Sequence, residues 1–397
     1  MEQKSKMLKF REDHQKHKDD AQDAIEYYRK LSVETRAKYA RIASLFSEEH
    51  RTEAEDVMLT ELQSEYSAFV SADYMMSKNL PFWGESPQLA KTYYQMKLVC
   101  DVFGIIDHSK QGGESHYTYL CEELAARSKN SDHTISFFQH FIDTHIDSWV
   151  RNITFCLDNA RVCKNKYLLA WANELVDQGR FESVRFIYLV VGHTKFEPDR
   201  LFASIAKTFY KRDVFCIEML QDICELYSTG FVFRSGQVMQ WRSVLEEKYS
   251  VLPGITNLHD FHTSKVSASS ELKYRDNCYS GSYRARSLKK PHCSVNCCNP
   301  PSYELISSTL SDEKLQQLTE QHNRYIKAEV DDYVRPSFLC TPENASPSST
   351  TSGTAATVSS KKKRCCSVCD GKGHVQPGKK RHFSEKYCPI AAKQAKT

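Results

Sequence analysis

Hydrophobic positions in the middle of the chain alternate between runs of strand length and stretches with helical spacing. Three short β-prone runs with short connections favour antiparallel pairing; they are residues 66–74, 96–106 and 116–121. A helix is predicted after them, with Ser131 as its N-cap and Ile135, Phe138 and Ile142 at helical spacing. The remaining predicted elements are a strand at 153–158, a helix stopped by Gly179, a strand at 184–191 and a helix at 198–212.

The resulting order is three strands, helix, strand, helix, strand, helix. This is the order of the ribonuclease H-like fold, in which three antiparallel strands are followed by parallel βα units. The first and fourth strands of that fold are neighbours at the centre of the sheet. We therefore predict an α/β fold with a ribonuclease H-like mixed sheet flanked by helices.

Three acidic residues stand where this fold would bring them together. Asp73 ends the first strand, Asp158 ends the fourth, and Asp199 lies in the first turn of the helix after the fifth strand. Each alone is ordinary, because Asp favours turns and first helical turns. Jointly they predict a catalytic site that holds two Mg²⁺ or Mn²⁺ ions for phosphoryl chemistry. Glu197 is an alternative to Asp199 if the helix starts differently.

The sequence around two of these acids resembles a known family. DNARVCKNKYLL and GRFESVRFIYLVVGHTKFEPDRLF resemble a transposon-derived family with the pattern DNC-x-x-QNKN followed by GHTKF-x-PD-x-x-F. DYMMSKNLP resembles that family's first-strand pattern, so the similarity covers about residues 65–290. Ala160 and Cys163 depart from the family's Cys and Gln, whereas Asn159, Lys164 and Asn165 match.

The resemblance implies a DDE-type transposase or integrase-like core, with Asp73, Asp158 and Asp199 as catalytic metal ligands. The polar residues next to these acids are second-rank candidates for nucleic-acid contact; they are Lys164, Asn165, His193 and Lys195. A structural histidine and solvated lysines are the simpler interpretation of the same positions.

The flanking segments complete the predicted domain organisation. Residues 1–65 have periodic apolar positions among dense mixed charge and predict a solvated or partner-facing helical arm. The core is predicted at 66–250, with 213–250 helical. Residues 251–340 predict further short strands and a helix that starts at Ser311, and 341–360 are a low-complexity linker.

The basic tail, residues 361–397, is the second candidate site. Cys366 and Cys369 form a CxxC and His374 follows at the spacing of a zinc knuckle, but Cys388 lies further away than is usual. His382 therefore competes as a ligand, and Cys365 is an alternative to Cys366. We predict one Zn²⁺ held by this small tail; a reduced tail without structure is the alternative.

Composition and charge narrow the function further. The chain has 397 residues, of which 40% are hydrophobic, so it can bury a sizeable core. Its N-terminus is too charged for a secretory signal and apolar runs such as FIYLVV are too short for a bilayer, so we expect no membrane association and reduced cysteines. Residues 361–397 carry eleven Lys and Arg against two acids, a net +9, whereas the first 360 residues carry 43 against 48, a net −5.

These observations predict a nuclear, DNA-binding, transposase-like protein that cleaves DNA phosphodiesters and joins strands, with homo-oligomerisation possible. A catalytically inactive DNA-binding or protein-interaction module is the first alternative, and a nuclease without strand transfer is the second. The chain opens within a helical pattern, which also fits an element copy that is truncated at its N-terminus.

Overall fold

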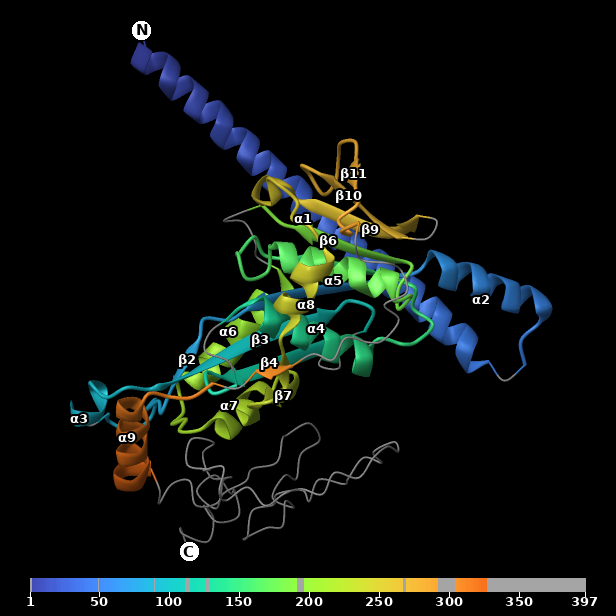
Figure 1. Ribbon diagram of the computed structural model, residues 1–397. Helices are drawn as coiled ribbons and strands as arrows, with labels where there is room; N and C mark the ends of the chain where they lie inside the picture. Colours follow the sequence, from blue (N-terminus) through green and yellow to red (C-terminus); the bar gives the residue numbers. More distant parts are fainter. Residues whose placement is uncertain are drawn as a thin grey trace, which may run out of the picture. The chain divides into compact units, whose positions relative to one another are not determined.

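The computed structural model describes residues 2–48, 50–88, 90–110, 115–125, 129–190, 196–266, 269–291, 304–306 and 308–326. The chain divides into two units, Met1–Thr341 and Pro342–Thr397. All the elements described below belong to the first unit (Figure 1). Among the described residues, no helix combines the length and the apolar character that crossing a membrane requires.

A mixed sheet forms the centre of the first unit. Its strands are β1 (Ser67–Tyr74), β2 (Lys78–Leu80), β3 (Leu98–Asp107), β4 (His116–Glu122), β5 (Asn152–Leu157), β6 (Ser183–Tyr188), β7 (Thr229–Phe233), β9 (Asp260–Val266), β10 (Ser269–Arg275) and β11 (Arg284–Arg286). They pair in the order β11-β10-β9-β6-β5-β1-β3-β4-β7, with β2 also paired to β3. A separate two-stranded sheet joins β8 (Val238–Met239) to β12 (Leu305–Ile306).

Pairing at the sheet centre follows the prediction. β3 pairs antiparallel with both β1 and β4, as their short connections indicated. β1 pairs parallel with β5, which pairs parallel with β6. The prediction that the first and fourth strands are neighbours is therefore confirmed, and so is the mixed α/β class.

Helices cover both faces of this sheet. The described helices are α1 (Glu2–Ser47), α2 (Glu53–Glu65), α3 (Ala90–Tyr93), α4 (Ser131–His145), α5 (Lys166–Asp177), α6 (Glu197–Phe209), α7 (Ile217–Cys224), α8 (Trp241–Lys248) and α9 (Asp312–Gln321), with short helical turns at Ile255–Asn257 and His322–Ile326. α4, α5 and α8 pack together over the core that contains Phe155 and Trp171 (Figure 1). α6 and α7 cover a second core around Val102 and Leu120.

The segment 213–250 differs from the helical prediction. It forms two short helices, α7 and α8, with β7 and β8 between them. β7 pairs parallel with β4 and extends the sheet, because its sequence TGFVF is rich in β-branched and aromatic residues. Leu226 lies beyond the end of α7 and Val238 lies in β8, so neither residue is in a helix as the prediction for 213–250 required.

Two smaller predictions also need correction. Asn130, not Ser131, caps α4, because its Oδ1 accepts the backbone N–H groups of Asp132 and His133. The predicted strand order also omitted β2, which lies between the first two predicted strands. By contrast, the strands expected after residue 251 are present, and Ser311 caps α9 as predicted.

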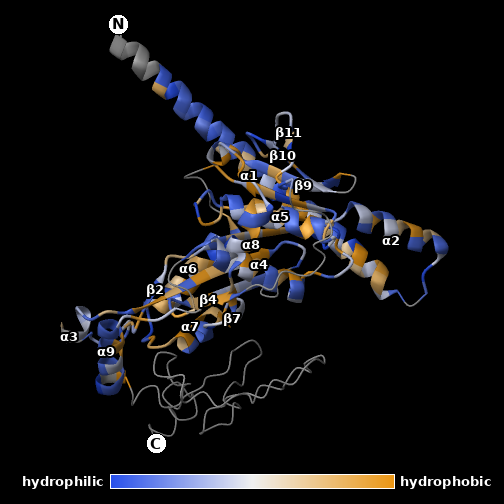
Figure 2. Ribbon diagram, in the orientation of Figure 1, coloured by the Kyte–Doolittle hydropathy of each residue, from blue (hydrophilic) through white to orange (hydrophobic). Residues whose placement is uncertain are grey.

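The N-terminal arm is helical, but its inner face is not solvated. Ala24, Tyr28 and Ile42 of α1 are buried at 1–4% exposure, and α1 contacts β1 directly. Figure 2 shows the matching pattern: the strands at the sheet centre are largely hydrophobic, whereas much of α1 is hydrophilic. α1 is therefore a covering helix of the sheet over part of its length.

Candidate active site

The ends of β1 and β5 place two of the predicted acids side by side. The parallel register of these strands runs to Ala72 opposite Leu157, and Asp73 and Asp158 are the next residue on each chain. Neighbouring strands lie about 4.8 Å apart, so the two backbones remain adjacent at this point. Both side chains are partly exposed, so a ligand can reach them from solvent.

A glycine brings the third acid close. Gly104 of β3 pairs with Asp73 across the antiparallel register. A Cβ atom at Gly104 would lie 2.7 Å from the Phe202 ring of α6, so only glycine lets α6 pack this closely on the sheet. Asp199 is one turn before Phe202 on α6, and its Oδ2 accepts the Phe196 N–H at 3.2 Å.

The charges of Asp158 and Asp199 act on Asp73, and the charge of Asp158 acts on Asp199, so the three carboxylates lie within electrostatic range of one another. Burial, and then the negative charges of Asp158 and Asp199, raise the pKa of Asp73 from 3.8 to about 7, against the opposing hydrogen bond from the Tyr74 N–H. Burial and the charge of Asp158 also raise the pKa of Asp199. The cluster thus concentrates negative charge that a cation would offset.

The donor set suits a hard divalent cation, although the acids do not converge on one point. Within the described residues, no three His, Cys, Asp or Glu side chains lie close enough together to hold a metal ion. Mg²⁺ needs only one or two carboxylates, because water and substrate phosphate oxygens complete its coordination. Carboxylates are its preferred protein ligands, so the chemistry of Asp73, Asp158 and Asp199 fits Mg²⁺ or Mn²⁺.

Glu197, the alternative to Asp199, has a different partner. The Tyr28 hydroxyl of α1 donates a short hydrogen bond to Glu197 Oε2. Burial opposes ionisation of Glu197, but this hydrogen bond and the nearby His108 outweigh it and lower the pKa of the carboxyl. Glu197 is not among the main causes of the raised pKa of Asp73 or Asp199. The hydrogen bond from Tyr28 to Glu197 therefore favours Asp199 as the third acid of the site.

A buried polar network behind the site was not expected from the sequence. His108, at the end of β3, lies 2.9 Å from the Ser32 hydroxyl through Nδ1 and 2.8 Å from the Ser71 hydroxyl through Nε2. Tyr28 also reaches His108 Nε2, at 3.1 Å. This network ties α1 to β1 two residues before Asp73. Sequence alone offered no local signal for it, because His108 lies 37 to 80 residues away from each of its three partners.

His108 makes folding stability depend on pH. Burial lowers the pKa of His108 from 6.5 to about 4. Below pH 6.5 the unfolded chain binds a proton that the folded chain excludes, so stability falls as the pH drops from 6.5 to 4. At about 1.4 kcal/mol per pH unit, His108 contributes a loss of roughly 3 kcal/mol.

Replacing His108 by Gln should therefore reduce the difference in unfolding free energy between pH 7 and pH 4 by that amount, measured by urea denaturation. His14→Gln removes an imidazole from the exposed part of α1 and is the control. Equal pH dependence of the two variants would contradict the assignment.

The residues after Asp158 hold the loop in place. Asn159 Nδ2 donates to the Leu189 carbonyl at the end of β6. Lys164 Nζ donates to Asn159 Oδ1 at 2.6 Å and to the Thr256 carbonyl at 3.0 Å. Asn165 Oδ1 caps α5 by accepting the Tyr167 and Leu168 N–H groups. The DN and KN pairs thus fix the path of the chain from the acid to the helix.

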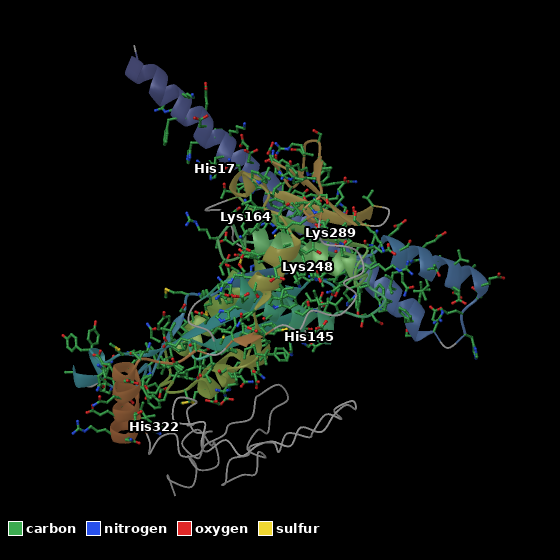
Figure 3. The ribbon with its side chains drawn as sticks, in the orientation of Figure 1. His17, His145, Lys164, Lys248, Lys289 and His322 are labelled. Atoms are coloured by element: carbon green, nitrogen blue, oxygen red, sulfur yellow. The ribbon has the colours of Figure 1, made fainter. Side chains whose placement is uncertain are left out.

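This geometry does not favour the phosphate contacts predicted for Lys164 and Asn165. Lys164, labelled in Figure 3, is only 6% exposed, and burial lowers the pKa of its ammonium to about 8. Asn165 uses its remaining donor on the carbonyls of Arg161 and Val162. A nucleic-acid contact would require both side chains to leave these partners. Their arrangement supports a structural role.

The other predicted site residues lie outside the described part of the chain. They are His193 and Lys195, and the tail residues Cys366, Cys369, His374, His382 and Cys388. The zinc site therefore stays a prediction, based on ligand spacing.

Metal analysis of the purified chain should find one Zn²⁺, and Cys369→Ser should release it because a CxxC supplies half of a tetrahedral site. Unchanged zinc content in this variant would exclude the site.

Comparison with known proteins adds one match. Residues 90–280 match a family model described as a domain of unknown function, DUF7869. The matched region runs from α3 to the segment after β10, so it includes Asp158 and Asp199 but not Asp73. Searches of curated proteins and of solved structures found no match. The description of the matched model assigns no activity.

Proposed function

We propose that this chain is a transposase-like protein whose acid cluster supports metal-dependent cleavage of DNA phosphodiesters. The observation that carries the proposal is the adjacency of Asp73 and Asp158 at the ends of β1 and β5, with Asp199 of α6 within electrostatic range of both. Carboxylates are costly to gather without a cation, because each raises the pKa of its neighbours. Such clusters are frequent at functional sites.

Sheet topology supports a ribonuclease H-like core for this site. The segment β4-β3-β1-β5-β6 has three antiparallel strands followed by two that run parallel to β1. In that fold the acids of the first and fourth strands are adjacent at the sheet centre, as Asp73 and Asp158 are here. The outer strands of the sheet are additions to this core: β7 on one side, and β9, β10 and β11 on the other.

The proposed chemistry divides between the residues and the ions. Asp73, Asp158 and Asp199 would hold Mg²⁺ or Mn²⁺, which when bound supply the charge that activates the attacking oxygen and stabilises the leaving oxygen. Water would attack phosphorus and release a 3′-hydroxyl. That hydroxyl would then attack a phosphodiester of a second strand, forming one P–O bond as another breaks. The chain's own part is to fix the acids: Gly104 admits α6, and Asn159 anchors the loop after Asp158.

A non-catalytic DNA-binding module is the second candidate. The observation that favours it is the lack of convergence of the acids within the described residues. Cys163 is fully buried, and burial raises the pKa of its thiol well above 9.0, so it offers no substitute chemistry. The module would use the basic tail for DNA and keep the sheet as a scaffold.

An assay of the full chain separates the two candidates. Supercoiled plasmid DNA is incubated with the purified protein and Mg²⁺, Mn²⁺ or EDTA, and nicked and linear products are measured. We expect cleavage with either divalent ion and none with EDTA. If the protein binds DNA but cleaves it with neither Mg²⁺ nor Mn²⁺, the result favours the non-catalytic DNA-binding module.

A further inference from the structure

Helix α6 presents two distinct faces. Its inner face buries Leu201, Phe202, Ile205 and Phe209 against the sheet and α7. Arg200 and Lys207 are exposed on the opposite face, and Lys211 is exposed just beyond the end of the helix. At 100° per residue these three cations fall within about 40° of one another on the helical wheel. They form a single stripe, which we call the α6 stripe.

The cations of this stripe are available to a ligand. The side chains of Lys207 and Lys211 make no hydrogen bond or ion pair within the described residues. The Arg200 guanidinium lies 3.6 Å from Glu197, and its side chain is 78% exposed, so this ion pair is weak. A ligand anion could therefore recruit all three cations at little cost in existing contacts.

The α6 stripe also differs from the other helical surfaces. In α6 the acids Glu197 and Asp199 are only partly exposed and lie in the first turn, whereas the exposed charged side chains, Arg200 and Lys207, are both cations. Every other described helix of at least eight residues that exposes ionisable groups exposes acids among them, such as Asp143 of α4 and Glu246 of α8. An ordinary solvated helix face mixes both signs. A stripe of one sign on a body whose first 360 residues carry a net −5 indicates an anionic partner.

The position of the stripe identifies the kind of partner. It begins at Arg200, immediately after Asp199, and extends about 10 Å along the helix to Lys207, at 1.5 Å per residue; Lys211 continues it just beyond the helix end. A polyanion bound along the stripe would therefore reach Asp199 at its Arg200 end. The strand spacing of nucleic-acid phosphates provides several charges over that length. Tyr210, which is 50% exposed next to Lys211, adds an aromatic face for stacking a base.

We propose that the α6 stripe binds the sugar-phosphate backbone of the DNA strand that enters the acid cluster, an inference that rests on the proposed function. Arg200, Lys207 and Lys211 contact successive phosphates and set the register of the strand relative to Asp199. These contacts carry no base readout, because they meet only the backbone. The stripe thus positions the scissile phosphate independently of the sequence.

The test compares two double variants of the full chain that lose the same charge. Lys207→Gln with Lys211→Gln removes two cations of the stripe; Lys16→Gln with Lys18→Gln removes two exposed cations of α1. DNA affinity is measured by fluorescence anisotropy in EDTA across a series of salt concentrations. We expect the stripe variant to bind about tenfold or more weakly and its slope of log K against log salt to shrink by about 2. The α1 variant should match the parent.

Several outcomes would overturn the proposal. One is an unchanged affinity and salt slope in the stripe variant; another is an equal loss in the α1 control, which would indicate a non-specific charge effect. A third is a loss of binding to vesicles of anionic lipid with DNA binding intact, because the partner would then be a membrane surface. Circular dichroism and thermal melts of each variant verify folding, which substitutions on an exposed face should leave nearly unchanged.

The binding test is distinguishable from the cleavage assay because it is done without divalent ions. If the parent protein never cuts DNA but the stripe variant loses DNA affinity, the result supports the α6 stripe as a DNA-binding surface and rules out the catalytic function. A parent that cuts, with a stripe variant of unchanged affinity, keeps the catalytic function and overturns the surface.

Discussion

Asp158→Asn should reduce metal-dependent DNA cleavage by at least about 10³-fold while leaving the fold and DNA affinity nearly unchanged. The amide has the shape of the carboxylate but not its charge, so it cannot help to hold a divalent cation. Asp158 follows β5 directly and neighbours Asp73 through the register of β1 and β5. Its charge also acts on both other acids. Initial rates of plasmid nicking with Mg²⁺ and Mn²⁺ provide the measurement.

Asp101→Asn is the matched control for this experiment. Asp101 is a largely buried carboxylate of β3 whose Oδ1 accepts the Ser77 hydroxyl at 2.7 Å, and it is not among the main causes of the raised pKa of Asp73. Its amide variant should cut DNA at close to the parental rate. Equal rates for Asp158→Asn and the parent would falsify the catalytic assignment, whatever cleavage the parent shows.

Glu197→Gln separates the two acids at the start of α6. Glu197 is bound by Tyr28 and lies outside the coupled cluster. Its variant should keep more activity than Asp199→Asn, because only Asp199 belongs to the proposed metal-holding set. Sequence spacing alone left this choice open, since both residues fall in the first helical turn; the hydrogen bond from α1 to Glu197 favours Asp199.

The central sheet was predictable because local signals and topology agreed there. Short connections specify antiparallel neighbours, and strands separated by helices specify parallel ones. Asp73 and Asp158 could be placed side by side because each follows an apolar run of clear strand length. β7 was missed because a five-residue run between two helices is ambiguous from periodicity alone.

Contacts between distant segments were beyond sequence reasoning. α1 reads as a solvated helix since charged residues dominate it, yet Tyr28 reaches β1, β3 and α6 at separations of 43 to 169 residues. Lys164 reads as a candidate phosphate ligand, although the Thr256 carbonyl 92 residues away holds it inside the protein. In both cases the partner is specified by the assembled fold, and a single sequence does not reveal it.

The strands beyond β6 depend on a buried ion cluster of the same long-range kind. Asp260 of β9 is 0% exposed and accepts two hydrogen bonds from Arg185 of β6, at 2.9 and 2.7 Å. Arg275 of β10 and the Tyr283 hydroxyl each donate to its Oδ2 at 2.7 Å. The Asp260 carboxylate therefore joins the strands β6, β9 and β10. Because the site is buried, this carboxylate is the counter-charge that the two guanidinium groups need.

Asp260→Asn should lower the free energy of unfolding by about 3–5 kcal/mol, because it leaves two guanidinium groups in the interior without a counter-charge. Asp276→Asn is the control: Asp276 pairs with Arg284 at 2.7 Å, but these side chains are 74% and 54% exposed. An exposed pair of this kind contributes at most about 1 kcal/mol. Urea denaturation of both variants measures the difference. If Asp260→Asn were no more destabilising than Asp276→Asn, the attachment of β9 and β10 to the sheet would have to come from backbone pairing and apolar burial alone.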